Sequence, residues 1–152
     1  MYSFLLPLHS IFRWLVLLSL SYAIYVSFMG KTRKLTFTKG LNQVRHWTAT
    51  IAHIQLIIGI LLYTQSPIVK YFGATGMNEW NDSTFFGLIH MVLMLVAIVI
   101  ITIGSAKAKR KATDAEKFNT MFIFFLIGLL LILIAIPWPF SPLASRPYLR
   151  PF

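Results

Sequence analysis

Residues 84–105 read TFFGLIHMVLMLVAIVIITIGS, a stretch without a charged side chain. A helix needs about 20 mostly apolar residues to cross the hydrocarbon core of a bilayer, and this stretch is long enough. Three further stretches, at residues 5–28, 45–64 and 117–136, meet the same requirement. The sequence therefore predicts an all-α integral membrane four-helix bundle in one domain, with short connections that make neighbouring helices antiparallel.

The composition of the chain also indicates a lipid environment. Of the 152 residues, 57% are hydrophobic and only 12% are charged, less than the surface of a soluble domain requires. The absence of cysteine excludes disulfides, iron–sulfur clusters and thiolate zinc sites. The net charge of +10 comes from short basic runs between apolar stretches. Such runs suit lipid headgroups, and we expect no nucleic-acid partner.

Helix-breaking and capping residues separate the four stretches. Gly30 is predicted to end the first helix, and Pro67 to stop the second, because proline cannot continue the backbone ladder. Thr113 and Glu116 form the pattern of a capping box ahead of the fourth helix. Beyond that helix, residues 137–152 mix prolines with aromatic side chains, and we expect an irregular tail at the membrane interface.

Lysine and arginine are distributed unevenly among the connections. The second connection, residues 65–83, is the longest and has only Lys70; its residues 68–72 are expected to lie flat as a short amphipathic turn. Arg146 and Arg150 in the tail are outnumbered by the basic residues in or beside the first and third connections. By the positive-inside rule, those two connections are cytoplasmic and both termini are periplasmic. The basic residues concerned are Lys31, Arg33, Lys34, Lys39, Arg45, Lys107, Lys109, Arg110, Lys111 and Lys117.

Four histidines lie within or at the ends of the predicted helices: His9, His46, His53 and His90. Ionisable residues inside a membrane are costly and mark functional sites. At a rise of about 1.5 Å per residue, His9 lies roughly 6 Å, and His90 roughly 9 Å, from the outer ends of their parallel helices. The two imidazoles therefore share a level. In an apolar bundle, this arrangement favours a haem iron held by both as axial ligands.

The other two histidines lie on the second predicted helix. His46 and His53 project from one face of it, about 10.5 Å apart along the axis, which is too far for one iron. His46 is next to Arg45 and Trp47, and we expect it at the cytoplasmic interface. His53 lies nearer the middle of the bilayer and is the reserve ligand.

Two other residues support the haem hypothesis. Arg13 follows His9 by one turn on the same helix face. Arginine is the best bidentate partner for a carboxylate, so we expect Arg13 to bind a haem propionate. Gly87, one turn before His90, leaves a groove in which a flat macrocycle could rest. Gly59 and Gly128 could do the same or could allow close helix packing.

A structural interpretation of the same residues is also open. A histidine in a membrane helix can simply hydrogen-bond to a neighbouring helix, and Arg13 can extend to the outer headgroups. No Asp or Glu lies inside a predicted helix, which disfavours a carboxylate-based carrier or channel. There is no nucleophile–base arrangement and no HExxH motif. We therefore expect an electron-transfer or accessory subunit rather than a stand-alone enzyme.

Several stretches resemble a family of small four-helix bacterial inner-membrane proteins commonly labelled cytochrome b. They are LHSIFRW at 8–14, RHWTATIAHIQ at 45–55, GLIHM at 87–91, IGSAKAKRK at 103–111 and IPWPFSP at 136–142. The resemblance spans nearly the whole chain. It implies a b-type haem and a role in electron transfer in a bacterial inner membrane.

One haem is expected rather than two. Larger di-haem cytochromes b place two histidines on one helix about four turns apart, and the spacing of His46 and His53 departs from that pattern. A single haem near one face cannot carry an electron across the whole bilayer. We therefore expect a second membrane redox protein as partner, and a homo-oligomer is left open.

Overall fold

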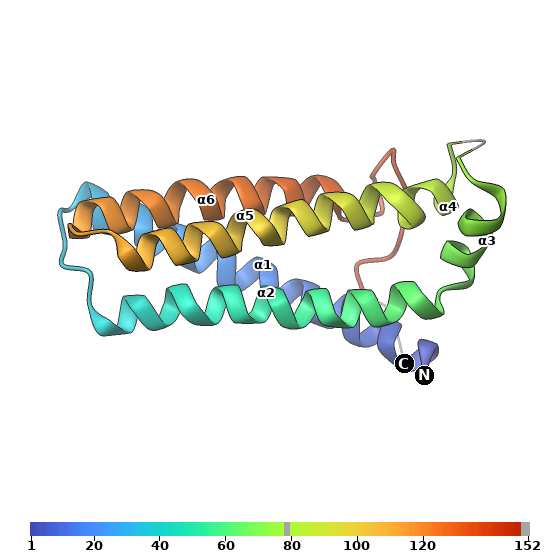
Figure 1. Ribbon diagram of the computed structural model, residues 1–152, viewed down its shortest axis with the longest axis horizontal. Helices are drawn as coiled ribbons and strands as arrows, with labels where there is room; N and C mark the ends of the chain where they lie inside the picture. The colour runs from blue at the N-terminus through green and yellow to red at the C-terminus, as the bar shows by residue number, and fades with distance from the viewer. Residues whose placement is uncertain (78–79, 150–152) are drawn as a thin grey trace.

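The computed structural model describes residues 1–77 and 80–149, so Arg150 and Phe152 of the predicted tail lie outside these ranges. Its described part contains helices and no strands, and it confirms the predicted all-α membrane bundle (Figure 1). Four helices are long and apolar enough to span a membrane, and the protein is therefore a multi-pass membrane protein. The elements are α1 (Tyr2–Thr32), α2 (Lys39–Gln65), α3 (Pro67–Thr75), α4 (Asp82–Thr84), the π-helical turn η1 (Phe85–Ile89), α5 (His90–Arg110) and α6 (Asp114–Ala135).

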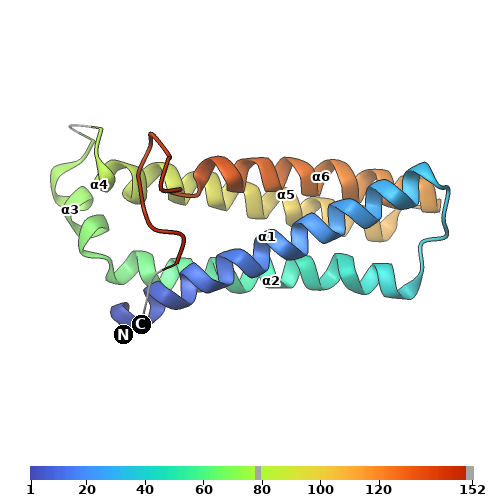
Figure 2. The ribbon, with the colours of Figure 1, turned by 180° about the vertical axis from the view of Figure 1, so that it is seen from behind.

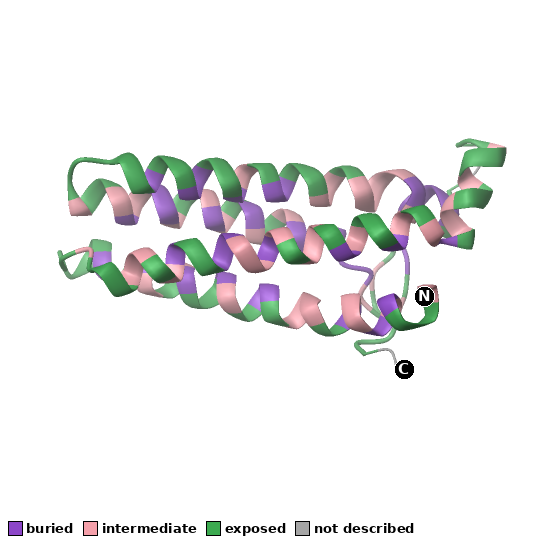
Figure 3. Cartoon of the chain, turned by 60° about the horizontal axis from the view of Figure 1, so that its bottom comes forward, coloured by how far each residue is buried: buried purple, intermediate pink, exposed green. Residues whose placement is uncertain are grey.

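The four long helices form a ring in the order α1, α2, α5, α6. Helix α5 packs most extensively against α6, and α1 lies against both α2 and α6, whereas α2 contacts α5 least. Buried residues face the centre of the ring and exposed apolar residues cover its outer faces (Figure 3). That distribution suits a surrounding of lipid rather than water.

The first helix extends past its predicted end. The prediction that Gly30 ends this helix was wrong, because α1 continues to Thr32. A Cβ atom on Gly30 would lie only 2.2 Å from the ring of Phe118 on α6, so this glycine is a packing residue. All four helices begin before or end after the predicted apolar stretches. Hydropathy marks only the hydrocarbon-crossing part of a helix, whereas the backbone ladder continues into the headgroup region.

The predicted capping and stop signals are confirmed. The Thr113 side chain accepts a hydrogen bond from the Glu116 N–H, and the Glu116 side chain accepts one from the Thr113 N–H, so α6 begins with a capping box. Helix α2 ends at Gln65, directly before Ser66 and Pro67. The Ser66 side chain then caps α3, which has Pro67 in its first turn. The expected short turn at residues 68–72 is therefore part of a nine-residue helix.

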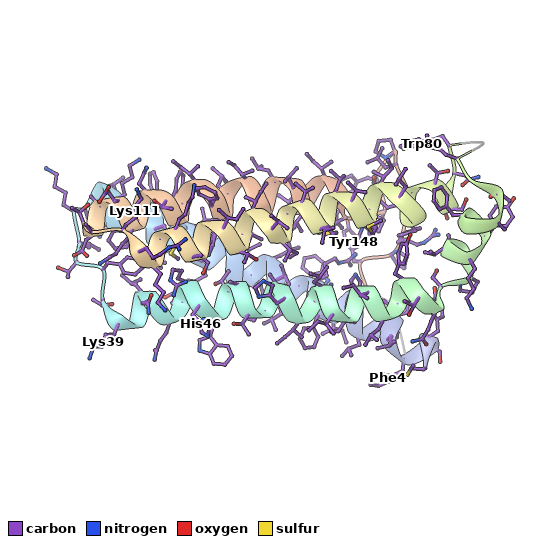
Figure 4. The ribbon with its side chains drawn as sticks, in the orientation of Figure 1. Phe4, Lys39, His46, Trp80, Lys111 and Tyr148 are labelled. Carbon is purple, nitrogen blue, oxygen red and sulfur yellow. The ribbon has the colours of Figure 1, made fainter. Side chains whose placement is uncertain are left out.

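Both basic connections lie at the same end of the bundle. Lys39 and Lys111 are at one end of the molecule in Figure 4, whereas Phe4, Trp80 and Tyr148 are at the other. Lys31 Nζ donates a hydrogen bond to Asn119 Oδ1 across that basic end (2.6 Å). We call the opposite end, which carries the N-terminus and the tail residues 137–149, the outer end. The side of the membrane that each end faces remains a prediction.

The described part of the tail, residues 137–149, is irregular and returns from α6 across the outer end to α1 (Figure 2). The Trp14 Nε1–H and the Arg13 guanidinium both donate to the Tyr148 carbonyl oxygen. The well-packed core, which includes Leu20, Ala52 and Phe125, occupies the rest of the bundle. A second, smaller apolar cluster of Leu5, Ile58 and Leu62 lies at the outer end, and a cavity lies beside it.

Candidate functional site

The rings of His9 and His90 lie close together near the outer end of the bundle. Their centroids are 6.4 Å apart and their planes are inclined by 69°. Helix α1 supplies His9, and His90 is the first residue of α5, which continues α4 and η1 in one span that begins at Asp82. The two helices run in the same direction, so the level that each histidine occupies follows from its distance from the helix start. The structure thus brings together the two residues that the sequence pairs.

The orientation of the His90 ring is fixed by the end of α6. Its Nδ1 lies 2.8 Å from the carbonyl oxygen of Ala135, and because a carbonyl only accepts, Nδ1 carries the proton. This carbonyl has no helical partner, since the residue four positions on is Pro139, which lacks an N–H. Donation from Nδ1 leaves the Nε2 lone pair of His90 available to a ligand.

The preceding residues reach His90 through a π-helical turn, η1. Such a turn holds one residue more than an α-helical turn, and single π turns inside α-helices occur frequently at functional sites. The rings of Phe85 and Phe86 in η1 lie 5.8 and 5.9 Å from the His90 ring. The turn therefore sets both the rotation of α5 at His90 and the aromatic wall beside it.

His9 lies on the face of α1 that packs against α2. Gln55 Nε2 donates a hydrogen bond to the His9 carbonyl oxygen (3.0 Å), and a Cβ atom on Gly59 would lie 3.3 Å from His9 Cε1. Three buried polar atoms here, His9 Nδ1, Ser10 Oγ and Gln55 Oε1, have no hydrogen-bond partner within the described residues. An unpaired buried polar atom costs about 1–3 kcal/mol. Within the described residues, His9 and its neighbours thus leave hydrogen-bonding capacity that a molecule bound beside them could use.

A cavity of about 430 Å³ lies between the two histidines and the surrounding helices. This volume is within the range of sites that hold small molecules and cofactors. Most of its wall is apolar, and the polar groups that line it include His9, His90, Gln55, Arg13 and Arg146. Gly59 also lines it, so the absence of a side chain there leaves space beside His9.

Arg13 lines the cavity and also contacts the tail. Its guanidinium lies 5.6 Å from the Trp14 ring and 5.8 Å from the Trp138 ring, besides donating to the Tyr148 carbonyl. Stacking on aromatic rings suits a guanidinium and holds it in place. Arg13 is therefore a fixed cation on the cavity wall one turn from His9, as the sequence predicts.

His53, the reserve ligand, lies away from the cavity and has a partner within the bundle. Its Nε2 lies 2.8 Å from Thr102 Oγ1 on α5. The Thr102 hydroxyl donates its one proton to the Ile98 carbonyl (2.7 Å), so His53 Nε2 must be the donor to Thr102. Nε2 of His53 thus carries a proton and connects two helices. The exposed His46 contacts Trp47, as expected of an interface residue.

Gly87 packs against α3 and not, as the sequence predicts, against a groove for the macrocycle. A Cβ atom there would lie 2.4 Å from the Phe72 ring, which means that α3 fills the space over this glycine. Its carbonyl oxygen accepts a hydrogen bond from the Tyr63 hydroxyl (2.8 Å). Gly87 is not among the residues that line the cavity. The glycine that opens space at the histidine pair is Gly59.

Sequence reasoning missed two parts of the site, the π turn η1 and Arg146. Neither has a local signal: η1 lies within a continuous apolar stretch, and Arg146 reaches the site only because the tail folds back. No group of three or more His, Cys, Asp or Glu that could hold a metal ion occurs within residues 1–77 and 80–149.

In comparisons with protein-family models, with curated proteins and with solved structures, nothing matched this chain. The resemblance to small cytochrome b-like membrane proteins therefore stays a prediction.

Proposed function

We propose that this protein binds one b-type haem between His9 and His90 and acts as an electron-transfer subunit of a bacterial inner membrane. The single observation that carries the proposal is the 6.4 Å separation of the two ring centroids. With metal–imidazole bonds of about 2.0 Å, two imidazoles on opposite sides of one metal ion have ring centroids about 6.3 Å apart. The two values agree closely.

The chemistry of the surrounding groups also fits a haem. His90 donates from Nδ1 to a backbone carbonyl, the arrangement that fixes the tautomer of a metal-binding histidine. His9 has a buried nitrogen without a partner within the described residues. The cavity is mostly apolar, as the body of a macrocycle requires, and Arg13 supplies a cation for a carboxylate.

In this proposal the chain binds and orients the haem and excludes water from it. A bound haem iron supplies reversible one-electron transfer, and the axial ligands and the apolar surroundings set its potential. His9 and His90 would hold the iron, Arg13 would bind a propionate, and the rings of Phe85 and Phe86 in η1 would keep water from the site. Because the site lies near the outer end, an electron needs a second membrane redox protein to cross the bilayer.

Visible spectroscopy tests the proposal directly. The full chain is expressed with an ample haem supply, purified in detergent, and its spectrum is recorded before and after reduction with dithionite. We expect a Soret band and α and β bands that sharpen on reduction. We also expect His9→Ala and His90→Ala to lose these low-spin bands, whereas the matched control His46→Ala keeps them. A colourless wild-type preparation would overturn the proposal.

One observation favours a second candidate, a non-redox accessory or scaffold subunit. The His53–Thr102 hydrogen bond is an interhelical contact of the kind that holds membrane bundles together. If all four histidines act in this way, the protein is colourless and His53→Ala destabilises it as much as His90→Ala does.

A further inference from the structure

Two arginines from different parts of the chain line the cavity. What we infer from them rests on the proposed function. Arg13 is one turn from His9 on α1. Arg146 belongs to the tail, and its guanidinium lies 5.1 Å from the Phe86 ring, which in turn lies 5.9 Å from the His90 ring. Arg13 is thus close to His9 along α1, and Arg146 lies beside the aromatic ring that contacts His90.

Arg146 is held in place from outside the cavity. Its Nη2 pairs with the Asp82 carboxylate on α4, and its Nη1 donates to the Ser145 carbonyl oxygen (2.9 Å). A guanidinium has five N–H donors, and these two bonds use two of them. Within the described residues the remaining donors have no further acceptor, and the side chain is only 24% exposed, so a carboxylate bound there would be largely shielded from water.

We propose that Arg13 and Arg146 form a two-point clamp for a ligand with an apolar body and two carboxylates. A haem has this chemistry, because its two propionates extend from one edge of the macrocycle. Arginine suits the task since its planar fork binds a carboxylate through two parallel hydrogen bonds. The clamp makes the tail part of the binding site: the contacts of Arg13 and Trp14 with Tyr148 and of Asp82 with Arg146 hold the tail over the outer end.

The test compares haem with its dimethyl ester, in which both carboxylates are blocked. The apo chain, expressed in full length under haem depletion, is titrated in detergent with each compound, and the dissociation constant is read from the Soret band. A charge-assisted hydrogen bond contributes about 1.5–3 kcal/mol, which corresponds to about tenfold or more in affinity. We expect wild type to bind haem at least about tenfold more tightly than the diester.

Variants of Arg146 test whether the preference for haem over the diester comes from the tail. Arg146→Gln is expected to weaken haem binding about tenfold more than it weakens diester binding, because only haem loses a carboxylate contact. Arg146→Lys, which keeps the charge but not the fork, should recover part of the loss. Arg110→Gln is the matched control, because it removes one exposed charge at the basic end, far from the cavity. Since residue 146 lies outside the helices, folding of these variants is expected to be unaffected.

The outcomes separate the clamp from the proposed function. Equal affinity for haem and diester, or an unchanged preference in Arg146→Gln, overturns the clamp while haem binding stands. Failure to bind either compound overturns both. A fatty acid also has an apolar body and a carboxylate. A competition experiment therefore adds excess oleate to the haem-bound protein. If oleate displaces haem in wild type but not in Arg146→Gln, the arginine serves lipid carboxylates and the assignment to propionates is wrong.

Discussion

His90 donates a hydrogen bond from Nδ1 to the carbonyl oxygen of Ala135, 2.8 Å away, at the last residue of α6. The prolines of the tail create this acceptor. Pro137 and Pro139 have no N–H to donate to the carbonyls of Leu133 and Ala135. Side-chain donors take the place of the missing backbone N–H groups. Trp138 Nε1 donates to the Leu133 carbonyl (2.9 Å), and His90 Nδ1 donates to the Ala135 carbonyl. The helix end that the prolines impose thus also fixes a histidine of the candidate site.

This relationship predicts that the two roles of His90 can be separated. His90→Ala leaves the Ala135 carbonyl without its donor and should lower the free energy of unfolding by about 1–3 kcal/mol. His90→Gln keeps an N–H donor but has no imidazole, so it should retain most of the stability and still lose the low-spin haem bands. Thermal unfolding in detergent and visible spectra measure the two effects. Low-spin bands in His90→Gln would show that His90 is not an axial ligand.

The existence of the helices and the pairing of His9 with His90 could be predicted from the sequence, because both follow from helical rise and apolar length. What could not be predicted depends on tertiary contacts. Gly30 looks like a helix end until the Phe118 ring is seen to pack on it. Gly87 looks like part of the cavity wall until the Phe72 ring of α3 is seen to fill the space over it. Arg146 is far from His90 in sequence and lines the same cavity only because the tail folds back.

The hydrogen bond between His53 and Thr102 predicts a purely structural role for His53. In a double-mutant cycle of His53→Ala and Thr102→Ala, we expect a coupling free energy of about 0.6 kcal/mol, the average for such bonds between membrane helices. The visible spectrum of both single variants should equal that of wild type. Loss of the low-spin bands in His53→Ala, with Thr102→Ala unaffected, would instead make the reserve ligand the true one.

Gly59 predicts how the cavity responds to added volume. A leucine there would place its side chain against His9, whose Cε1 lies 3.3 Å from the position of the new Cβ atom. Gly59→Leu should therefore lower the haem content per chain several-fold. Leucine is a better helix former than glycine, so the helical circular dichroism should not fall. Gly73→Leu is the control, since nothing lies within 4 Å of a Cβ atom at that position. Equal haem content in both variants would place the ligand elsewhere.

The charge asymmetry predicts the orientation in the membrane. The chain has no cysteine, so a single introduced cysteine reports its own side of the bilayer without background. Met77 lies at the outer end, and Thr36 lies in the basic connection between α1 and α2; both are exposed. Because positively charged connections stay in the cytoplasm, an impermeant maleimide applied to intact spheroplasts should label Met77→Cys and not Thr36→Cys. After lysis, both should react. The reverse pattern in intact spheroplasts would place the His9–His90 site on the cytoplasmic side, and an electron partner would then have to be sought there.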